Sequence, residues 1–147
     1  MNVKTKTALS IILPLLLLSV MILVYFIRNS SGDIKTAQAQ YKLSSKELNR
    51  EFILNDSITN LKYSGKIVEL HGIIADVKTS EAHGIIIVFD DPSMGVKCVM
   101  DSTIKEIPKD AEIGNTVKIK GICIGSDQLI GVMMNQCIIT EKSGTNH

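Results

Sequence analysis

Hydrophobic residues dominate the first part of the chain. From Thr7 to Ile27 there are 21 consecutive residues without a charge, and nearly all of them are apolar. A helix rises about 1.5 Å per residue, so this run extends for roughly 30 Å, the thickness of the hydrocarbon core of a bilayer. The pattern predicts an N-terminal transmembrane helix within residues 1–28, with membrane contact over residues 7–27.

The flanks of this segment favour an anchor that is not cleaved. A cleaved signal peptide has an apolar region of about 7 to 15 residues followed by small residues, whereas this run is longer and ends in bulky Tyr25 and Phe26. Cleavage remains the alternative. Lys4 and Lys6 precede the segment and Arg28 alone closes it, which predicts a cytoplasmic N-terminus and an extracytoplasmic domain, periplasmic or at the cell surface.

The next residues predict a linker and then a helix. Residues 29–43 are polar, with Ser, Gly and alternating Gln and Ala, which is typical of a linker. Ser44 to Glu47 has the Ser-x-x-Glu form of a capping box. A single apolar stripe then continues to about Lys62, and we expect it to pack on the domain; its members are Leu48, Phe52, Ile58 and Leu61.

From Ile67 onward the hydrophobic period changes from helical to two, which predicts strands. Five such strands follow, with a bulge or sharp bend expected at Gly72 and a short helix or irregular connection over 101–113. Five strands with internal glycines favour a small closed or nearly closed barrel. The domain is therefore expected over residues 44–141, with a disordered tail at 142–147.

The charge balance bears on the class of partner. All 15 acidic residues lie beyond the anchor, whereas three of the 16 basic residues lie in it or before it, so the domain carries a small net negative charge. The chain has no tryptophan and few other aromatic residues. Nucleic-acid binders normally gather a basic excess and stack bases on aromatic rings, so these features disfavour a nucleic-acid partner.

A family resemblance rests on several short motifs. They are Lys62-Tyr63-Ser64-Gly65-Lys66, Gly95-Val96-Lys97-Cys98, Lys120-Gly121-Ile122-Cys123-Ile124-Gly125 and Cys137-Ile138-Ile139, together with Val68, Leu70, Gly72, Ile74, Gly114 and Val117. In these the chain resembles the bacterial OB-fold proteins called tRNA-anticodon-binding-like (tRNA_anti-like), over about residues 44–139. The resemblance implies a mainly β fold: a five-stranded OB-fold barrel preceded by an α-helix. It implies no activity, because fold kinship does not supply function.

The resemblance also implies where a ligand would bind. OB barrels bind on their second and third strands and in two of their loops. In this sequence those places include Ser80 and Glu81 and eight candidate binding residues of mixed charge: Lys78, Thr79, His83, Lys97, Val99, Ser126, Asp127 and Gln128. This set suits a peptide, a glycan or a protein edge better than a polyphosphate, although ordinary loop solvation explains it equally well.

The cysteines and histidines suggest little chemistry. Cys98, Cys123 and Cys137 fall at inward strand positions, which favours buried free thiols, and a disulfide between Cys123 and Cys137 is the alternative. No closely spaced Cys and His pair predicts a metal site, and no cofactor is expected. The chain has no nucleophile elbow, phosphate-binding glycine loop or His-carboxylate set, so no catalytic residue is predicted.

These observations converge on one hypothesis and two rivals. The chain is expected to be a membrane-anchored, extracytoplasmic OB-fold module for binding or assembly, without catalysis, whose partner is the membrane and an envelope protein, peptide or glycan. The first rival is a nucleic-acid-binding OB domain in which Lys97, Lys118 and Lys120 contact phosphates. The second is a small envelope enzyme whose catalytic residues form no motif.

Overall fold

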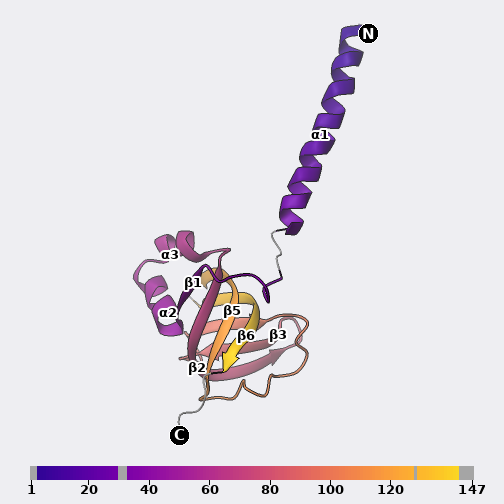
Figure 1. The fold of residues 1–147 in the computed structure, drawn as a ribbon. Helices are drawn as coiled ribbons and strands as arrows, with labels where there is room; N and C mark the ends of the chain where they lie inside the picture. The colour runs from indigo at the N-terminus through magenta and orange to yellow at the C-terminus, as the bar shows by residue number, and fades with distance from the viewer. Residues whose placement is uncertain (1–2, 30–32, 128, 143–147) are drawn as a thin grey trace. The chain divides into compact units, whose positions relative to one another are not determined.

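The computed structural model describes residues 3–29, 33–127 and 129–142. Its contacts divide the chain into two compact units, residues 1–33 and 34–147. The helices are α1 (Val3–Asn29), α2 (Ser45–Leu54) and α3 (Asp56–Tyr63), and the strands are β1 (Tyr41–Ser44), β2 (Ile67–Ser80), β3 (Gly84–Phe89), β4 (Val96–Met100), β5 (Thr116–Asp127) and β6 (Gly131–Lys142). Figure 1 shows these elements.

The first unit consists of α1, with Pro14 inside the helix. Within the part of the chain that the structure describes, no helix is both long enough and apolar enough to cross a membrane.

The second unit is a closed five-stranded barrel. The strands follow the order β2-β3-β4-β6-β5, and a further pairing of β2 with β5 closes the sheet on itself. The β4–β6 pair is parallel and the other barrel pairs are antiparallel. This is the arrangement of an OB fold, which confirms the predicted barrel.

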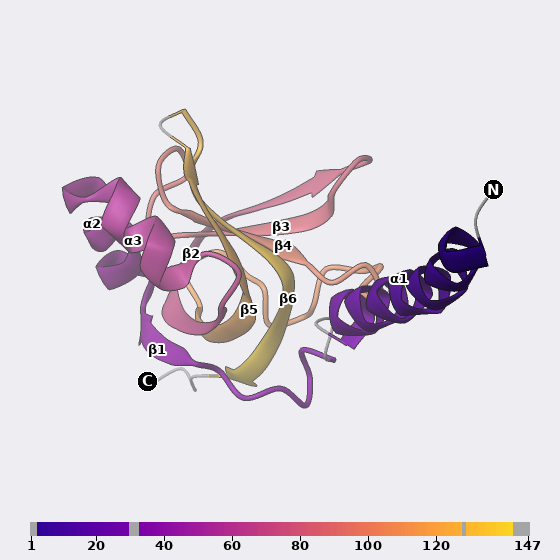
Figure 2. The same cartoon turned by 90° about the horizontal axis from the view of Figure 1, so that it is seen from above.

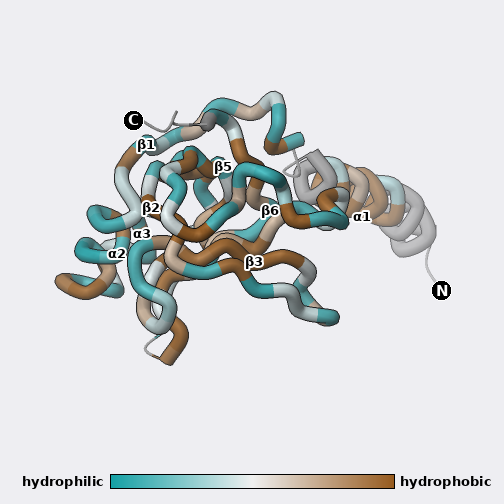
Figure 3. The backbone as a smooth tube through the Cα atoms, turned by 90° about the horizontal axis from the view of Figure 1, so that it is seen from below, coloured by the Kyte–Doolittle hydropathy of each residue, from teal (hydrophilic) through white to brown (hydrophobic). Residues whose placement is uncertain are grey.

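The alternation of apolar side chains explains the barrel core. Val68, Leu70 and Ile74 of β2 point inward, as do Ile87 and Phe89 of β3, and all are buried. The tube in Figure 3 is correspondingly brown, or hydrophobic, along β3. Closure pairs β2 with β5, so the two ends of the barrel sheet protect each other.

A sixth strand was not predicted. β1 pairs in parallel with β2, from Tyr41↔Val68 to Ser44↔His71, so residues 41–43 belong to the sheet rather than to a linker. The docked segment, which we define as residues 34–40, also belongs to the barrel unit, and Ile34 in it is buried. Its polar composition hid this, because a single buried isoleucine and a four-residue strand leave almost no pattern.

The predicted helix is in fact two helices. The capping prediction is confirmed, since the Ser44 hydroxyl accepts a hydrogen bond from the Glu47 backbone N–H. The helix then stops at Asn55, whose backbone is non-helical and whose side chain caps α3. Leu48 and Phe52 are buried as expected, but the rest of the predicted stripe was wrong, because Ile58 is exposed. Figure 2 shows α2 and α3 together on one side of the barrel.

The expected bulge lies elsewhere in β2. The register of β2 against β3 shifts between Ile74 and Asp76, not at Gly72. Gly72 is needed because there is no space for a side chain at this position: a Cβ would lie 2.1 Å from the Ser45 hydroxyl oxygen. The connection over 101–113 has no helix. The predicted tail at 142–147 lies outside the described residues apart from Lys142, the last residue of β6.

Candidate ligand-binding site

A cavity of about 560 Å³ opens where β4 leaves β3, and we call it the fork pocket. The β2–β3 ladder continues to the Ser80↔Gly84 pair, whereas the β3–β4 ladder stops at Ile86↔Val99. On its other side β4 stays paired with β6 beyond this point, to Met100↔Cys137. The divergence of β3 and β4 creates the pocket.

The wall on the β4 side is shaped by Asp101. Its carboxylate accepts hydrogen bonds from the backbone N–H and the hydroxyl of Thr103, at 2.9 and 2.6 Å. These bonds hold the pKa of the Asp101 carboxyl below its ordinary value, the hydroxyl bond being the largest cause. The Asp101 backbone N–H donates to the Cys137 carbonyl, which fixes the start of the connection against β6.

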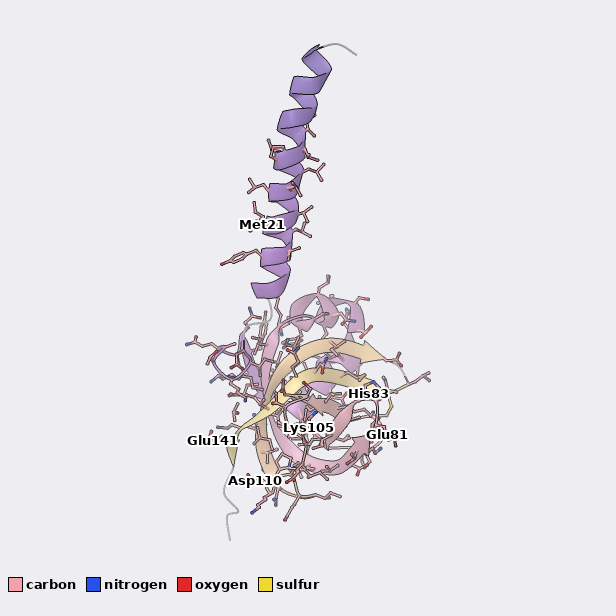
Figure 4. The ribbon with its side chains drawn as sticks, turned by 90° about the vertical axis from the view of Figure 1, so that its right-hand side faces the viewer. Met21, Glu81, His83, Lys105, Asp110 and Glu141 are labelled. Atoms are coloured by element: carbon pink, nitrogen blue, oxygen red, sulfur yellow. The ribbon has the colours of Figure 1, made fainter. Side chains whose placement is uncertain are left out.

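The charged rim of the fork pocket carries both signs. Glu81 and His83 come from the turn between β2 and β3, and Lys105 comes from the connection after β4. Figure 4 shows these three labelled side chains on the same side of the barrel. With Asp101 also in the lining, the pocket offers two acids and one lysine.

Two amide side chains reach the pocket because β6 is irregular. Gln136 has a left-handed backbone (φ 51°), and the pairing of β5 with β6 skips from Ile122↔Asn135 to Lys120↔Ile138. Such a bulge re-aims side chains that would otherwise alternate between faces. Asn135 and Gln136 are consecutive, yet both are exposed and both line the fork pocket.

The predicted lysines lie on the outer face of the barrel sheet and are engaged there. Lys78 forms an ion pair with Asp76 at 3.3 Å. The Lys97 ammonium donates to the carbonyls of Ser93 and Ile130, so it joins the β3–β4 turn to the β5–β6 hairpin. Burial lowers the pKa of Lys97, and the nearby positive charge of Lys78 adds to this effect.

The remaining predicted residues line a different cavity. Ser126 and Asp127 border a groove of about 300 Å³ between α2 and the β5–β6 hairpin, which we call the hairpin groove; Phe52 and Met94 also line it. The Ser126 hydroxyl donates to Asp56 at the start of α3. Gln128 lies outside the described residues.

The structure therefore divides the predicted site. Thr79, His83 and Val99 line the fork pocket, Ser126 and Asp127 line the hairpin groove, and the two lysines lie on the sheet face. Glu81 also lies in a predicted binding loop and lines the fork pocket, whereas the polar lining residues that the sequence did not single out are Asp101, Ser102, Lys105, Asn135 and Gln136. One signal was available, because the polar pair Asn135-Gln136 interrupts the alternation of β6 just before Cys137.

The cysteines gather inside the barrel. All three are buried, and their thiols are free in the structure. Burial raises the pKa of the Cys123 thiol to about 11, and burial together with a hydrogen bond to Cys98 raises that of Cys137 well above its ordinary value. The alternative bridge between Cys123 and Cys137 remains a prediction.

Metal-binding geometry is not found among the described residues. No three His, Cys, Asp or Glu side chains of residues 3–29, 33–127 and 129–142 are grouped so that they could hold a metal ion. His71 and His83 are exposed, and His147 lies outside this range.

The family assignment agrees with the barrel and its preceding helices. The model of the tRNA_anti-like family matches residues 1–138. The chain belongs to the tRNA_anti-like family. The observed OB barrel is the fold that the resemblance to this family implied.

Solved structures extend the comparison. One similar solved structure is that of a Klebsiella pneumoniae lipoprotein whose name describes it as a proposed nucleic acid-binding protein. The two structures align with a TM-score of 0.57 and 20% sequence identity, and the alignment covers 75% of this chain and 98% of the Klebsiella chain. At that identity the likeness shows the fold alone. An asparaginyl-tRNA synthetase from Entamoeba histolytica gives a TM-score of 0.38 and 15% identity over 56% of this chain and 22% of its own, which is too weak to support an argument. No curated protein matches the chain.

Proposed function

We propose that this chain is a membrane-anchored, extracytoplasmic OB-fold module that binds a ligand or partner protein without catalysing a reaction. The observation that carries the proposal is the fork pocket, which combines amides and charges of both signs over an apolar floor. Binding sites of this kind are largely apolar hollows with a few polar groups that orient the ligand.

The anchor and its direction rest on the sequence. The 21 uncharged residues from Thr7 to Ile27 have the length of a membrane span. Lys4 and Lys6 precede them and Arg28 follows, a bias that favours a cytoplasmic N-terminus.

The chemistry of the fork pocket supports binding rather than catalysis. A general acid or base works best when its pKa lies near the ambient pH, whereas the hydrogen bonds from Thr103 keep the Asp101 carboxyl ionised. All three thiols are buried in the barrel, and burial raises the pKa of Cys123 and Cys137 above the ordinary thiol value, which makes these two poor nucleophiles at neutral pH.

Reporter fusions test the location of the domain. Alkaline phosphatase, which is active only outside the cytoplasm, and green fluorescent protein, which fluoresces only inside it, are fused in parallel to the C-terminus of the full chain. We expect phosphatase activity and no fluorescence. Fluorescence without phosphatase activity would overturn the proposed orientation.

A nucleic-acid-binding module is the second candidate, and the name of the Klebsiella neighbour favours it. The lysines that would contact phosphates are, however, already engaged. Lys97 donates to two carbonyls, Lys118 pairs with Glu141, and Lys120 is buried. This candidate predicts binding of oligouridylate or oligothymidylate that weakens steeply as salt is raised. No measurable binding at low salt would eliminate it.

A further inference from the structure

The fork pocket borders one edge of β3, at Gly84 and Ile85. Gly84 and Ile85 still pair with β2 on one side, through Ser80↔Gly84 and Thr79↔Ile85. On the other side the ladder with β4 has already ended at Ile86↔Val99. The edge of a strand at such a place is a template for an incoming extended chain, which binds by adding main-chain hydrogen bonds.

The bulge in β6 places two amides beside this edge. A carboxamide both donates and accepts hydrogen bonds, which are the two functions of a peptide group. Asn135 uses its side-chain oxygen to accept from the Gln136 backbone N–H at 2.8 Å. This bond uses the amide oxygen of Asn135 and not its N–H donors, and both Asn135 and Gln136 are exposed.

The charges and the apolar floor of the fork pocket further limit the class of ligand that it can bind. Two carboxylates against one lysine repel a polyphosphate, and none of the side chains that line the pocket is a phenyl, phenol or indole ring on which a base could stack. Its floor includes buried Ile85 and Val99 and half-buried Ile104. A floor of this kind accepts the alternate side chains that an extended peptide presents to one face.

We propose that the fork pocket binds an extended polypeptide segment, which adds to the free edge of β3 at Gly84–Ile85 and is held along its backbone by Asn135 and Gln136. Glu81 and Lys105 select its side chains by charge. This inference rests on the proposed function, because it names the partner class of the same pocket.

The test uses the full chain in lipid nanodiscs and a displayed library of random dodecapeptides. Peptides enriched on the protein over empty nanodiscs are synthesised, and their affinity is measured by fluorescence anisotropy. The double variant N135D/Q136E replaces both amides with carboxylates of the same shape, and the carboxylate introduced at position 135 still accepts the bond from the backbone N–H of residue 136. We expect the double variant to weaken binding about tenfold or more, by loss of the amide donors. The matched change Q38E, an exposed amide outside the fork pocket, is expected to leave affinity unchanged.

Hydrogen exchange locates the bound peptide. We expect backbone amides at Gly84 and Ile85 to exchange more slowly in the complex, because an added strand pairs with this edge. Overturning results are no enriched peptide, equal affinities for N135D/Q136E and the parent chain, or protection confined to other segments. Binding of oligouridylate that the same variant abolishes would also overturn the peptide assignment. These results are separable from a failure of the proposed function, which the reporter fusions detect in cells.

Discussion

At the scale of single residues, Lys120 is the one buried lysine among the described residues. Its ammonium donates to the carbonyls of Lys35 and Ala37, at 3.2 and 2.8 Å, and so ties the docked segment to β5. A buried cation persists only where such partners replace its hydration. The bonds explain why a polar stretch that reads as a linker is held on the barrel.

Replacing Lys120 with methionine should release this segment. K120M keeps the length of the side chain but leaves two carbonyls without their donor, at a cost of about 1–3 kcal/mol. We expect faster trypsin cleavage after Lys35 and a lower urea midpoint. K118M is the control, because Lys118 forms only an exposed ion pair with Glu141, which contributes little. Equal cleavage rates for K120M and K118M would contradict this role of Lys120.

The buried thiols should be inert in the folded protein. The thiolate is the reactive form, and burial raises the pKa of Cys123 from 9.0 to about 11. We expect Cys98, Cys123 and Cys137 to react with Ellman's reagent at pH 8 only at the rate of unfolding. Rapid labelling of any of them would be inconsistent with this burial. Fewer than three thiols in the unfolded, unreduced protein would reveal the bridge that the sequence left open.

The same shift gives a dependence of stability on pH. The folded-state pKa of Cys123 lies above its unfolded value, so its contribution to stability is complete below about pH 9 and is lost as the pH rises toward 11. The free energy of unfolding should therefore fall over this range, and it should fall less in C123A. Urea titrations at several pH values measure the difference. An equal fall in both proteins would assign the effect to other groups.

At the scale of elements, the junction of α2, β2 and β3 depends on one glycine. The Ser45 hydroxyl donates to the Asp90 carboxylate, and it lies against Gly72. A Cβ at position 72 would meet the Ser45 oxygen at 2.1 Å and the Phe89 ring at 3.0 Å. The backbone of Gly72 is not left-handed, so the requirement for glycine is steric.

The variant G72A should lower stability by about 1–3 kcal/mol through overpacking. S45A removes the hydroxyl, and should itself cost a similar amount because Asp90 loses its donor. In the double variant G72A/S45A the main clash is absent, so its loss of stability should be smaller than the sum of the losses in the two single variants. Urea unfolding of the four proteins measures this coupling, and strict additivity would argue against the close approach.

The sequence predicted elements better than it predicted their junctions. Period-two alternation identified the five barrel strands because each buries one face. It did not identify the break at Asn55, since a capping asparagine also occurs within ordinary helical patterns, and the break turns Ile58 to solvent. Nor could it identify β1, whose four residues are stabilised by pairing with β2 and not by local preference.

The candidate site shows the same limit. Thr79 and Val99 were assigned to one site because the family resemblance implied the usual ligand-binding face of an OB barrel, and the strand order β2-β3-β4 does bring them to one pocket. Asn135 and Gln136 were missed, because the position of a bulge depends on the register of three strands. Ser126 and Asp127 were assigned to the same site, but the hairpin that carries them leans toward α2.

At the scale of the whole molecule, the chain divides into two compact units at residues 33 and 34. Ile34 begins the barrel unit and is 5% exposed. The sheet, by contrast, begins only at Tyr41. The folding unit therefore begins before its first strand, and the docked segment, residues 34–40, is part of it.

Two truncations test this boundary. A fragment of residues 34–147 retains every barrel contact, so we expect it to unfold cooperatively with the stability of the full chain. A fragment of residues 41–147 loses the buried side chain of Ile34 and the two carbonyls that accept hydrogen bonds from Lys120. Together these losses should lower the free energy of unfolding by about 3 kcal/mol. Urea unfolding followed by circular dichroism compares them. Equal stability of the two fragments would mean that residues 34–40 are only a linker; a large loss already in the fragment 34–147 would mean that the barrel depends on the first unit.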